Sequence, residues 1–106
     1  MAKFMIEASY SPEGVQGLMK EGASGRAAAL KKAAASLGGK LDAIYCVLGE
    51  RDAMVIVDFP DTISAAGFAL AVSSTHFAET KTTCLLTAAE IDQAVKKNVS
   101  YRAPGK

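Results

Sequence analysis

The side chains best suited to chemistry fall into a few short stretches of the chain. Arg51 carries a guanidinium that pairs with carboxylate or phosphate, and the neighbouring carboxylates of Glu50 and Asp52 can accept a proton. His76 is the only imidazole, able to titrate near neutral pH. The sequence assigns no catalytic residue; the candidate ligand-binding residues are Tyr10, Ser11, Glu50, Arg51, Asp52, His76 and Lys81.

Each candidate also has a plainer interpretation. Charged residues between two strands commonly serve as solvated turn residues, which applies to the stretch around Arg51. A lone histidine such as His76, in a loop before a strand, is commonly a surface residue. Lys81 stands between threonines in a predicted edge strand, where a charge can block unwanted strand pairing instead of binding a ligand.

The two cysteines, Cys46 and Cys84, lie far apart in sequence and have no second metal ligand nearby. We therefore expect no metal site and no cofactor, and we expect both residues to be buried thiols. The predicted strand order places them on the two outer strands, about 14 Å apart at the usual strand spacing, which excludes a disulfide between them.

The elements that position these residues follow from hydrophobic periodicity. Alternation predicts a strand over 3–9, and Ser11 before Pro12 predicts the start of a short helix. The alanine-rich stretch 24–37 predicts a first long helix, which the glycines at 38 and 39 end.

The second half of the chain repeats this pattern. Two apolar runs, 41–48 and 53–59, flank a four-residue connection and predict a hairpin. Asp61 caps a second long helix that ends near residue 74, and 81–86 predicts a fourth strand. Thr87 and the glutamate three residues later form a capping box that opens a last helix.

The order of these elements predicts an α+β fold of the ferredoxin-like type. Strand, helix, strand, strand, helix, strand is the split βαβ pattern, an antiparallel sheet with helices on one face, and here an extra C-terminal helix follows. We expect one domain over residues 1–100 and a flexible tail over 101–106. This topology gathers the end of the first strand, the hairpin and the start of the fourth strand at one end of the sheet.

Both alternate sets of residues in the two hairpin strands are largely apolar. A sheet that is apolar on both faces needs a second cover, and a second copy of the chain is the simplest one. The prediction is a homodimer or higher oligomer with a dimeric α+β barrel as its architecture. The alternative is that the C-terminal helix folds back over the open face.

Composition limits the partners. Twelve basic and eleven acidic side chains give a net charge of +1, and aromatic residues are few, so the sequence predicts no nucleic-acid binding and no membrane binding. The first residues are too soon charged for a signal peptide, which leads us to expect a cytoplasmic protein.

Three stretches resemble the GYD domain family, and the resemblance extends over nearly the whole chain: 8–15, 37–41 and 81–87. The hairpin element of that family, Gly-Glu-Tyr-Asp, stands here as Gly49-Glu50-Arg51-Asp52, with arginine in place of tyrosine. The resemblance implies a ferredoxin-like or dimeric α+β barrel protein of bacterial type. Its pattern points to Gly49, Glu50, Asp52 and Lys81.

Three functional hypotheses follow. The first is a homo-oligomeric ligand-binding or assembly module with a small anionic ligand near Arg51 and the helix amino ends. The second is a cofactor-free or haem-dependent enzyme of the dimeric barrel type, a monooxygenase or isomerase, with His76 or Asp52 as acid, base or ligand. The third is a purely structural oligomer.

Overall fold

A computed structural model describes residues 1–106. Four strands and four helices follow one another in the order that the sequence predicts. Their bounds are β1 (Ala2–Tyr10), α1 (Pro12–Glu21), α2 (Ala23–Ser36), β2 (Lys40–Cys46), β3 (Ala53–Phe59), α3 (Thr62–Ser73), β4 (Ala78–Leu85) and α4 (Ala88–Val95).

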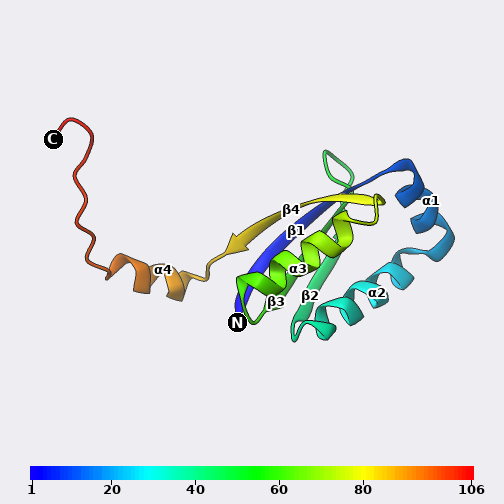
Figure 1. The fold of residues 1–106 in the computed structure, drawn as a ribbon, viewed down its shortest axis with the longest axis horizontal. Coiled ribbons are helices and arrows are strands. Elements are labelled where there is room, and N and C mark those ends of the chain that lie inside the picture. The colour runs from blue at the N-terminus through cyan, green and yellow to red at the C-terminus, as the bar shows by residue number, and fades with distance from the viewer.

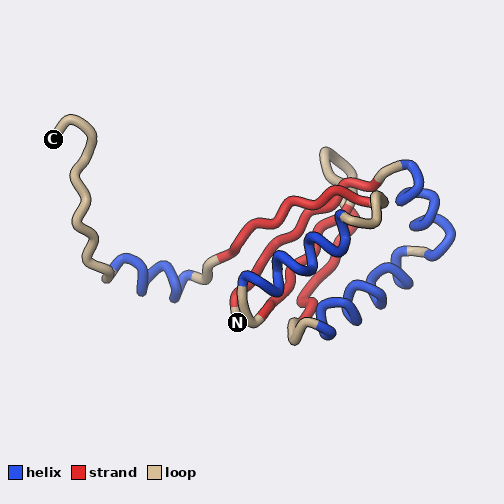
Figure 2. The backbone as a smooth tube through the Cα atoms, in the orientation of Figure 1, coloured by secondary structure: helices blue, strands red, loops and turns tan.

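The strands form one antiparallel sheet in the order β2-β3-β1-β4. This is the ferredoxin-like topology, and β2 and β4 are its outer strands, as predicted (Figures 1 and 2). Two bounds differ from the prediction by more than one residue: β4 begins at Ala78, earlier than Lys81, and β2 ends at Cys46 instead of Leu48. The hairpin connection is correspondingly longer than four residues.

The core lies between the helices and one face of the sheet, which we call the helix-side face. Residues from β1 and β3 meet residues from α2 and α3 there. The ring of Phe59 is fully buried, with centroids 6.2 Å from Phe4 and 5.4 Å from Phe68. Such tilted aromatic pairs add stability beyond their buried area. The other core members are Ile6, Ala34, Val55, Val57 and Ala65.

Local signals fix the helix ends where the sequence places them. Ser11, Asp61 and Thr87 each accept a hydrogen bond at the N-terminus of a helix, and Thr87 forms a complete capping box with Glu90. At the end of α2, Gly38 has φ +74° and donates its N–H to the carbonyl of Ala35, 3.0 Å away. That left-handed position is the reason for a glycine there.

The second face of the sheet, the open face, has no helix over it. Its central residues are apolar and partly exposed, among them Met5, Met54 and Ile56, and Tyr45 of the outer strand is 61% exposed. The prediction of an apolar second face therefore holds for these positions. Polar residues flank them, because β1 also carries Lys3 and Glu7 on this face.

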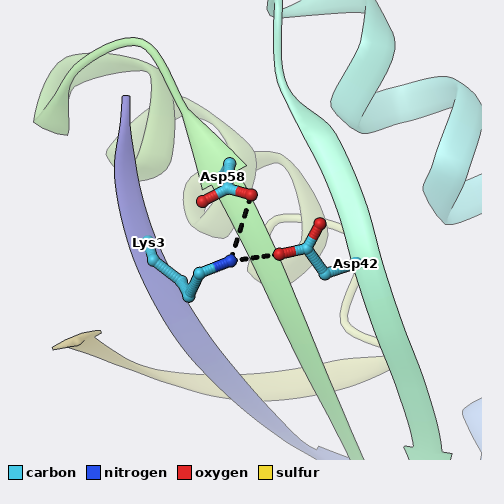
Figure 3. Close-up of polar contacts among 3 residues, drawn as sticks. All are labelled: Lys3, Asp42 and Asp58. Atoms are coloured by element: carbon cyan, nitrogen blue, oxygen red, sulfur yellow. Dashed lines mark hydrogen bonds and ion pairs between the residues drawn. The ribbon is translucent and has the colours of Figure 1, made fainter. Parts of the chain in front are cut away.

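An ion cluster closes one end of the open face. Lys3 Nζ bonds the carboxylates of both Asp42 and Asp58, the latter at 3.1 Å (Figure 3). The three residues come from three different strands, and a β-bulge in β2 between Leu41 and Ala43 turns Asp42 toward the lysine. The hydrogen bonds from Lys3 lower the pKa of Asp42, and the two carboxylates raise the pKa of Lys3.

The prediction of buried thiols is wrong. Cys46 and Cys84 are both free and exposed. Each lies on an outer strand, where a neighbouring strand covers one side only. The prediction that no disulfide joins them agrees with their places on opposite edges of the sheet.

Helix α4 does not fold back over the open face. It continues from the end of β4 and leads the chain away from the sheet, so that the C-terminus is far from the rest of the molecule (Figure 1). The Cα radius of gyration is 16.9 Å, above the ~13 Å of a compact chain of about this length. We call residues 86–106 the C-terminal arm and residues 1–85 the body. The domain bounds 1–100 and 101–106 stay a prediction.

Candidate functional site

Backbone hydrogen bonds draw several predicted site residues together at one end of the sheet. Asp52 Oδ2 accepts the N–H of Tyr10 at 2.7 Å, and the N–H of Asp52 donates to the carbonyl of Ala8 at 2.9 Å. The N–H of Ser11 donates to the carbonyl of Phe77 at 2.9 Å. The end of β1, the hairpin and the start of β4 therefore meet, as the topology predicts.

The same bonds show what these side chains already do. The Asp52 carboxylate holds the end of β1, and Ser11 Oγ caps α1 by accepting the N–H of Gly14 at 3.1 Å. Arg51 Nη1 donates to Ser9 Oγ at 3.3 Å, which directs the guanidinium toward the end of β1. These contacts position the chain, and they leave Arg51 the only one of the three with free donors.

The side chains of the remaining candidates make no hydrogen bond to this cluster. Glu50 is exposed in the hairpin loop. His76 is exposed with φ 64°, a left-handed conformation that histidine adopts more readily than most residues. Lys81 is opposite Glu7 in the β1–β4 register, on the open face, as an edge-strand charge.

A cavity of about 670 Å³ lies on the helix-side face, between the helices and the sheet. Residues of β1, β3 and β4 line its floor, and residues of α1, α2 and α3 line its walls. Most of the lining is hydrophobic, including Ile6, Val55, Leu18, Leu30, Phe68 and Val72. Its volume falls within the range of small-molecule sites, which are mainly apolar with a few polar groups.

One face of α1 forms a wall of this cavity. Gly14, Gly17, Leu18 and Glu21 follow helical spacing and all line the cavity. A Cβ at Gly14 would collide with the carbonyl oxygen of Phe77, so glycine lets α1 approach the start of β4 closely. A Cβ at Gly17 would meet nothing within 4 Å. Glycine at position 17 therefore leaves space in the cavity.

Polar groups lie on the lining near the end of β1. Burial raises the pKa of the Tyr10 phenol, although the positive charge of Arg26 opposes that rise. Arg26 Nη1 pairs with Glu21 Oε1 at 3.3 Å, and the two side chains are 36% and 41% exposed. This arrangement gives the cavity one phenol and one exchangeable ion pair, and Glu13, Lys20, Thr75 and Thr80 are the other polar residues of the lining.

Of the seven predicted site residues, only Tyr10 lines the cavity. Neither His76 nor Asp52, each an acid, base or ligand in the enzymatic hypothesis, lines the cavity. Sequence reasoning missed the contribution of α1 and α2, including Gly17 and Arg26. The spacing of the glycines and Leu18 along α1 was a signal, because it marks one helix face with small side chains.

No group of three or more His, Cys, Asp or Glu side chains in the structure is placed to hold a metal ion. None of the helices combines the length and the apolar character needed to cross a bilayer.

The fold and the cavity define a ferredoxin-like protein with a pocket between its helices and its sheet. The family model of the GYD domain matches residues 4–95, so the chain belongs to the GYD domain family. The match extends from within β1 to the end of α4 and includes the hairpin element in which Arg51 stands. No curated protein matches the chain.

Proposed function

We propose that this GYD-domain protein is a homo-oligomeric binding protein whose helix-side cavity holds a small, largely apolar molecule. The single observation that supports binding is the cavity itself, about 670 Å³ with a mainly hydrophobic lining. Such a surface gains free energy when an apolar ligand replaces water, at roughly 25 cal/mol for each Å² of apolar area buried. The proposal assigns no reaction to the protein.

The polar groups of the cavity suggest where a ligand's polar end lies. Arg26 is already paired with Glu21, but the pair is partly exposed, and exposed pairs contribute little stability. An anionic group on the ligand can displace Glu21 and pair with Arg26, next to Tyr10. The anion is thus proposed at Arg26 on the cavity lining, and Arg51 is the second candidate, outside the lining.

The chain supplies a matched pair of variants for testing the cavity. Gly17 lines it, Gly67 on α3 does not, and a Cβ at either position would meet nothing within 4 Å. Gly17→Leu fills the cavity, whereas Gly67→Leu adds the same side chain to an exposed helix surface. Both variants are expected to fold, as circular dichroism would show.

The probe is 8-anilinonaphthalene-1-sulfonate, an apolar dye with one anionic group. The chain contains no tryptophan, so background emission is low. We expect the unaltered protein and Gly67→Leu to bind one dye per chain, and Gly17→Leu to bind at least tenfold more weakly, a difference of about 1.4 kcal/mol. Equal binding by both variants, or no binding by the folded protein, would refute the cavity as the site.

A competition series then identifies the ligand's polar end. Decanol and decanoate share a hydrocarbon chain and differ in charge. If Arg26 receives an anion, decanoate displaces the dye at lower concentration than decanol, and Arg26→Gln removes that difference. Equal displacement by the two would show that the cavity selects only for apolar character.

Self-association through the open face is the second part of the proposal. Met5, Met54 and Ile56 are apolar side chains near the middle of an uncovered sheet face, and a two-fold contact would cover both copies at once. Sedimentation velocity at micromolar concentration is expected to show a dimer or larger species. Ile56→Lys, on the open face of β3, should shift the protein toward monomer. Thr82→Lys, on the helix-side face of β4, should not. A monomeric unaltered protein would refute this part alone.

A further inference from the structure

The C-terminal arm presents apolar side chains that nothing in the chain covers. Leu86, Ile91, Val95 and Val99 are between 46% and 77% exposed, and Tyr101 is 74% exposed. Helix α4 has eight residues. An isolated helix shorter than about 12–15 residues is marginal in water, so α4 needs a surface to pack on.

The sequence nevertheless specifies α4 strongly. Thr87 Oγ1 accepts the N–H of Glu90 at 3.1 Å, and the Glu90 carboxylate accepts the N–H of Thr87 at 2.8 Å. Ala88, Ile91 and Val95 then follow at spacings of three and four, which places them on one side of the helix. A helix that is capped at its start and apolar along one side is typical of a helix that packs on another surface.

Helix α4 does not pack on the body of its own chain. No element of the body makes more than marginal contact with α4, and the arm extends away from the sheet (Figure 1). At the same time the open face remains uncovered, with Tyr45 of β2 61% exposed at its border. The chain therefore has two apolar surfaces, and neither covers the other.

Charge distinguishes the two parts. The arm holds two acidic residues, Glu90 and Asp92, and every charged residue after them is basic. In the body, acidic residues slightly outnumber basic ones. On the open face, the carboxylates of Asp42 and Asp58 both bond the ammonium of Lys3, and Lys40 is the partner of Asp58 in the β2–β3 register (Figure 3). The basic residues of the arm are Lys96, Lys97, Arg102 and Lys106.

We propose that the arm packs on a second copy of this chain, with Ile91 and Val95 against the border of that copy's open face and the basic residues beside its Asp42 and Asp58. This rests on the self-association proposed above and adds the exchange of arms. In a two-fold pair each copy gives one arm and receives one, so both uncovered surfaces are satisfied at once.

The arm more than doubles the apolar surface that a pair can bury. The open face presents six apolar residues and the arm adds nine, and the polar residues among them bring the total toward the 20–30 residues that a standard interface uses on each side. The open face alone offers fewer. Arm exchange thus supplies the contact area that the sheet lacks.

The test is a photo-crosslink in the full chain. Val95 is replaced by p-benzoylphenylalanine, and unlabelled and ¹⁵N-labelled protein are mixed, dissociated and reassembled before irradiation. Exchange predicts crosslinked peptides that combine the two labels as often as they share one, with attachment near Tyr45 and Asp42. The same replacement at Gln93, on the opposite side of α4, is expected to crosslink far less.

Other outcomes overturn the inference. Crosslinks that join only peptides of one label would show that the arm folds onto its own body, and no protein crosslink would show that it stays in water. Either result, with a dimer in sedimentation, leaves the proposed self-association intact. A monomer in sedimentation would end both, while dye binding in the cavity would still stand or fall by itself.

A substitution pair measures how much the arm contributes. Ile91→Asp places a charge in the packing stripe, and Gln93→Asp places the same charge on the other side of α4. We expect Ile91→Asp to weaken dimerisation at least tenfold and Gln93→Asp to change it less than threefold. Equal effects would overturn the inference, and unchanged dye binding by both variants would confirm that the body stays folded.

Discussion

The two faces of this sheet are made by the same strands and yet differ in how they are used. On the helix-side face, alternate residues of β3 are buried, and Val57 and Phe59 are fully so. On the open face, the intervening residues Met54 and Ile56 are only partly buried. Covering by helices, more than side-chain type, separates the two sets, since both contain large apolar residues.

The comparison teaches that the helix-side face holds the buried core, whereas no part of the chain covers the open face. Removing side chains from the helix-side face should therefore cost stability at any protein concentration. Removing them from the open face should matter most where copies meet, because association stabilises a fold in a concentration-dependent way. Four predictions test this difference, in order of decreasing effect.

Phe59→Ala should lower the free energy of unfolding by about 3–5 kcal/mol, because it removes a fully buried ring between Phe4 and Phe68. Ile56→Ala, on the open face, should cost less than about 2 kcal/mol in dilute protein. Urea denaturation at several protein concentrations measures both. The cost of Phe59→Ala is expected to stay constant, and that of Ile56→Ala to grow with concentration. Equal costs for the two would erase the distinction between the faces.

Gly14→Ala and Gly17→Ala sharpen the description of the helix-side face. At Gly14 a methyl group collides with the backbone of Phe77 and should destabilise by about 1–3 kcal/mol. At Gly17 it enters open space within a helix and should stabilise by about 0.5–1 kcal/mol. Thermal unfolding of both variants gives the comparison, and the same sign for the two would show that α1 does not pack as described.

Asp52→Ala and Glu50→Ala compare two carboxylates of the hairpin. Asp52 accepts the N–H of Tyr10, and its loss should cost about 1 kcal/mol and loosen the end of β1. Glu50 is exposed, and we expect its removal to change stability by less than about 0.5 kcal/mol. Hydrogen exchange at the Tyr10 amide, together with urea denaturation, is the measurement; slow exchange in Asp52→Ala would contradict the assigned bond.

The smallest effect concerns the ion cluster of the open face. The bonds from Lys3 lower the pKa of Asp42, so the stability that Asp42 contributes is present above its unfolded pKa and is lost as pH falls through the lower folded value. The pKa of Lys3 is raised above its ordinary 10.5 in the folded chain. The stability that Lys3 contributes is therefore present at lower pH and is lost as pH rises through the folded pKa.

Carbon NMR titration of the Asp42 carboxyl group tests the acid side of this argument. Its midpoint should lie below the ordinary 3.8 and should rise in Lys3→Met, because the ammonium that favours the ionised form is gone. Lys81→Met, on the same face but opposite Glu7, is the control and should leave the midpoint unchanged. If the midpoint of Asp42 were the same in Lys3→Met as in the unaltered protein, the cluster would not form.

Most of the fold could be predicted because its signals are local. Capping residues such as Ser11, Asp61 and Thr87 act within one helical turn, and strand alternation acts within a few residues. The order of elements then limits the topology to very few arrangements. The end of β4 was placed well and its start was not, because Ala78 is defined by pairing with Tyr10 and has no local signal.

The candidate site could be predicted only in part. The topology correctly brought Tyr10, Ser11 and Asp52 to one end of the sheet, since strand ends meet wherever the order of strands is known. It did not show that the Asp52 carboxylate would accept the backbone N–H of Tyr10 or that the cavity would lie beside α1. Those facts depend on distances between elements that sequence patterns do not carry.

By itself the sequence determined the elements, their order and the family, because these rest on periodicity, capping and motifs within short stretches of chain. Only the tertiary structure decided which surfaces are covered: the helix-side cavity, the exposure of Cys46 and Cys84, and the separation of the arm from the body. Whether a residue is buried depends on which distant parts of the chain pack against it, and the residue's own type does not determine this.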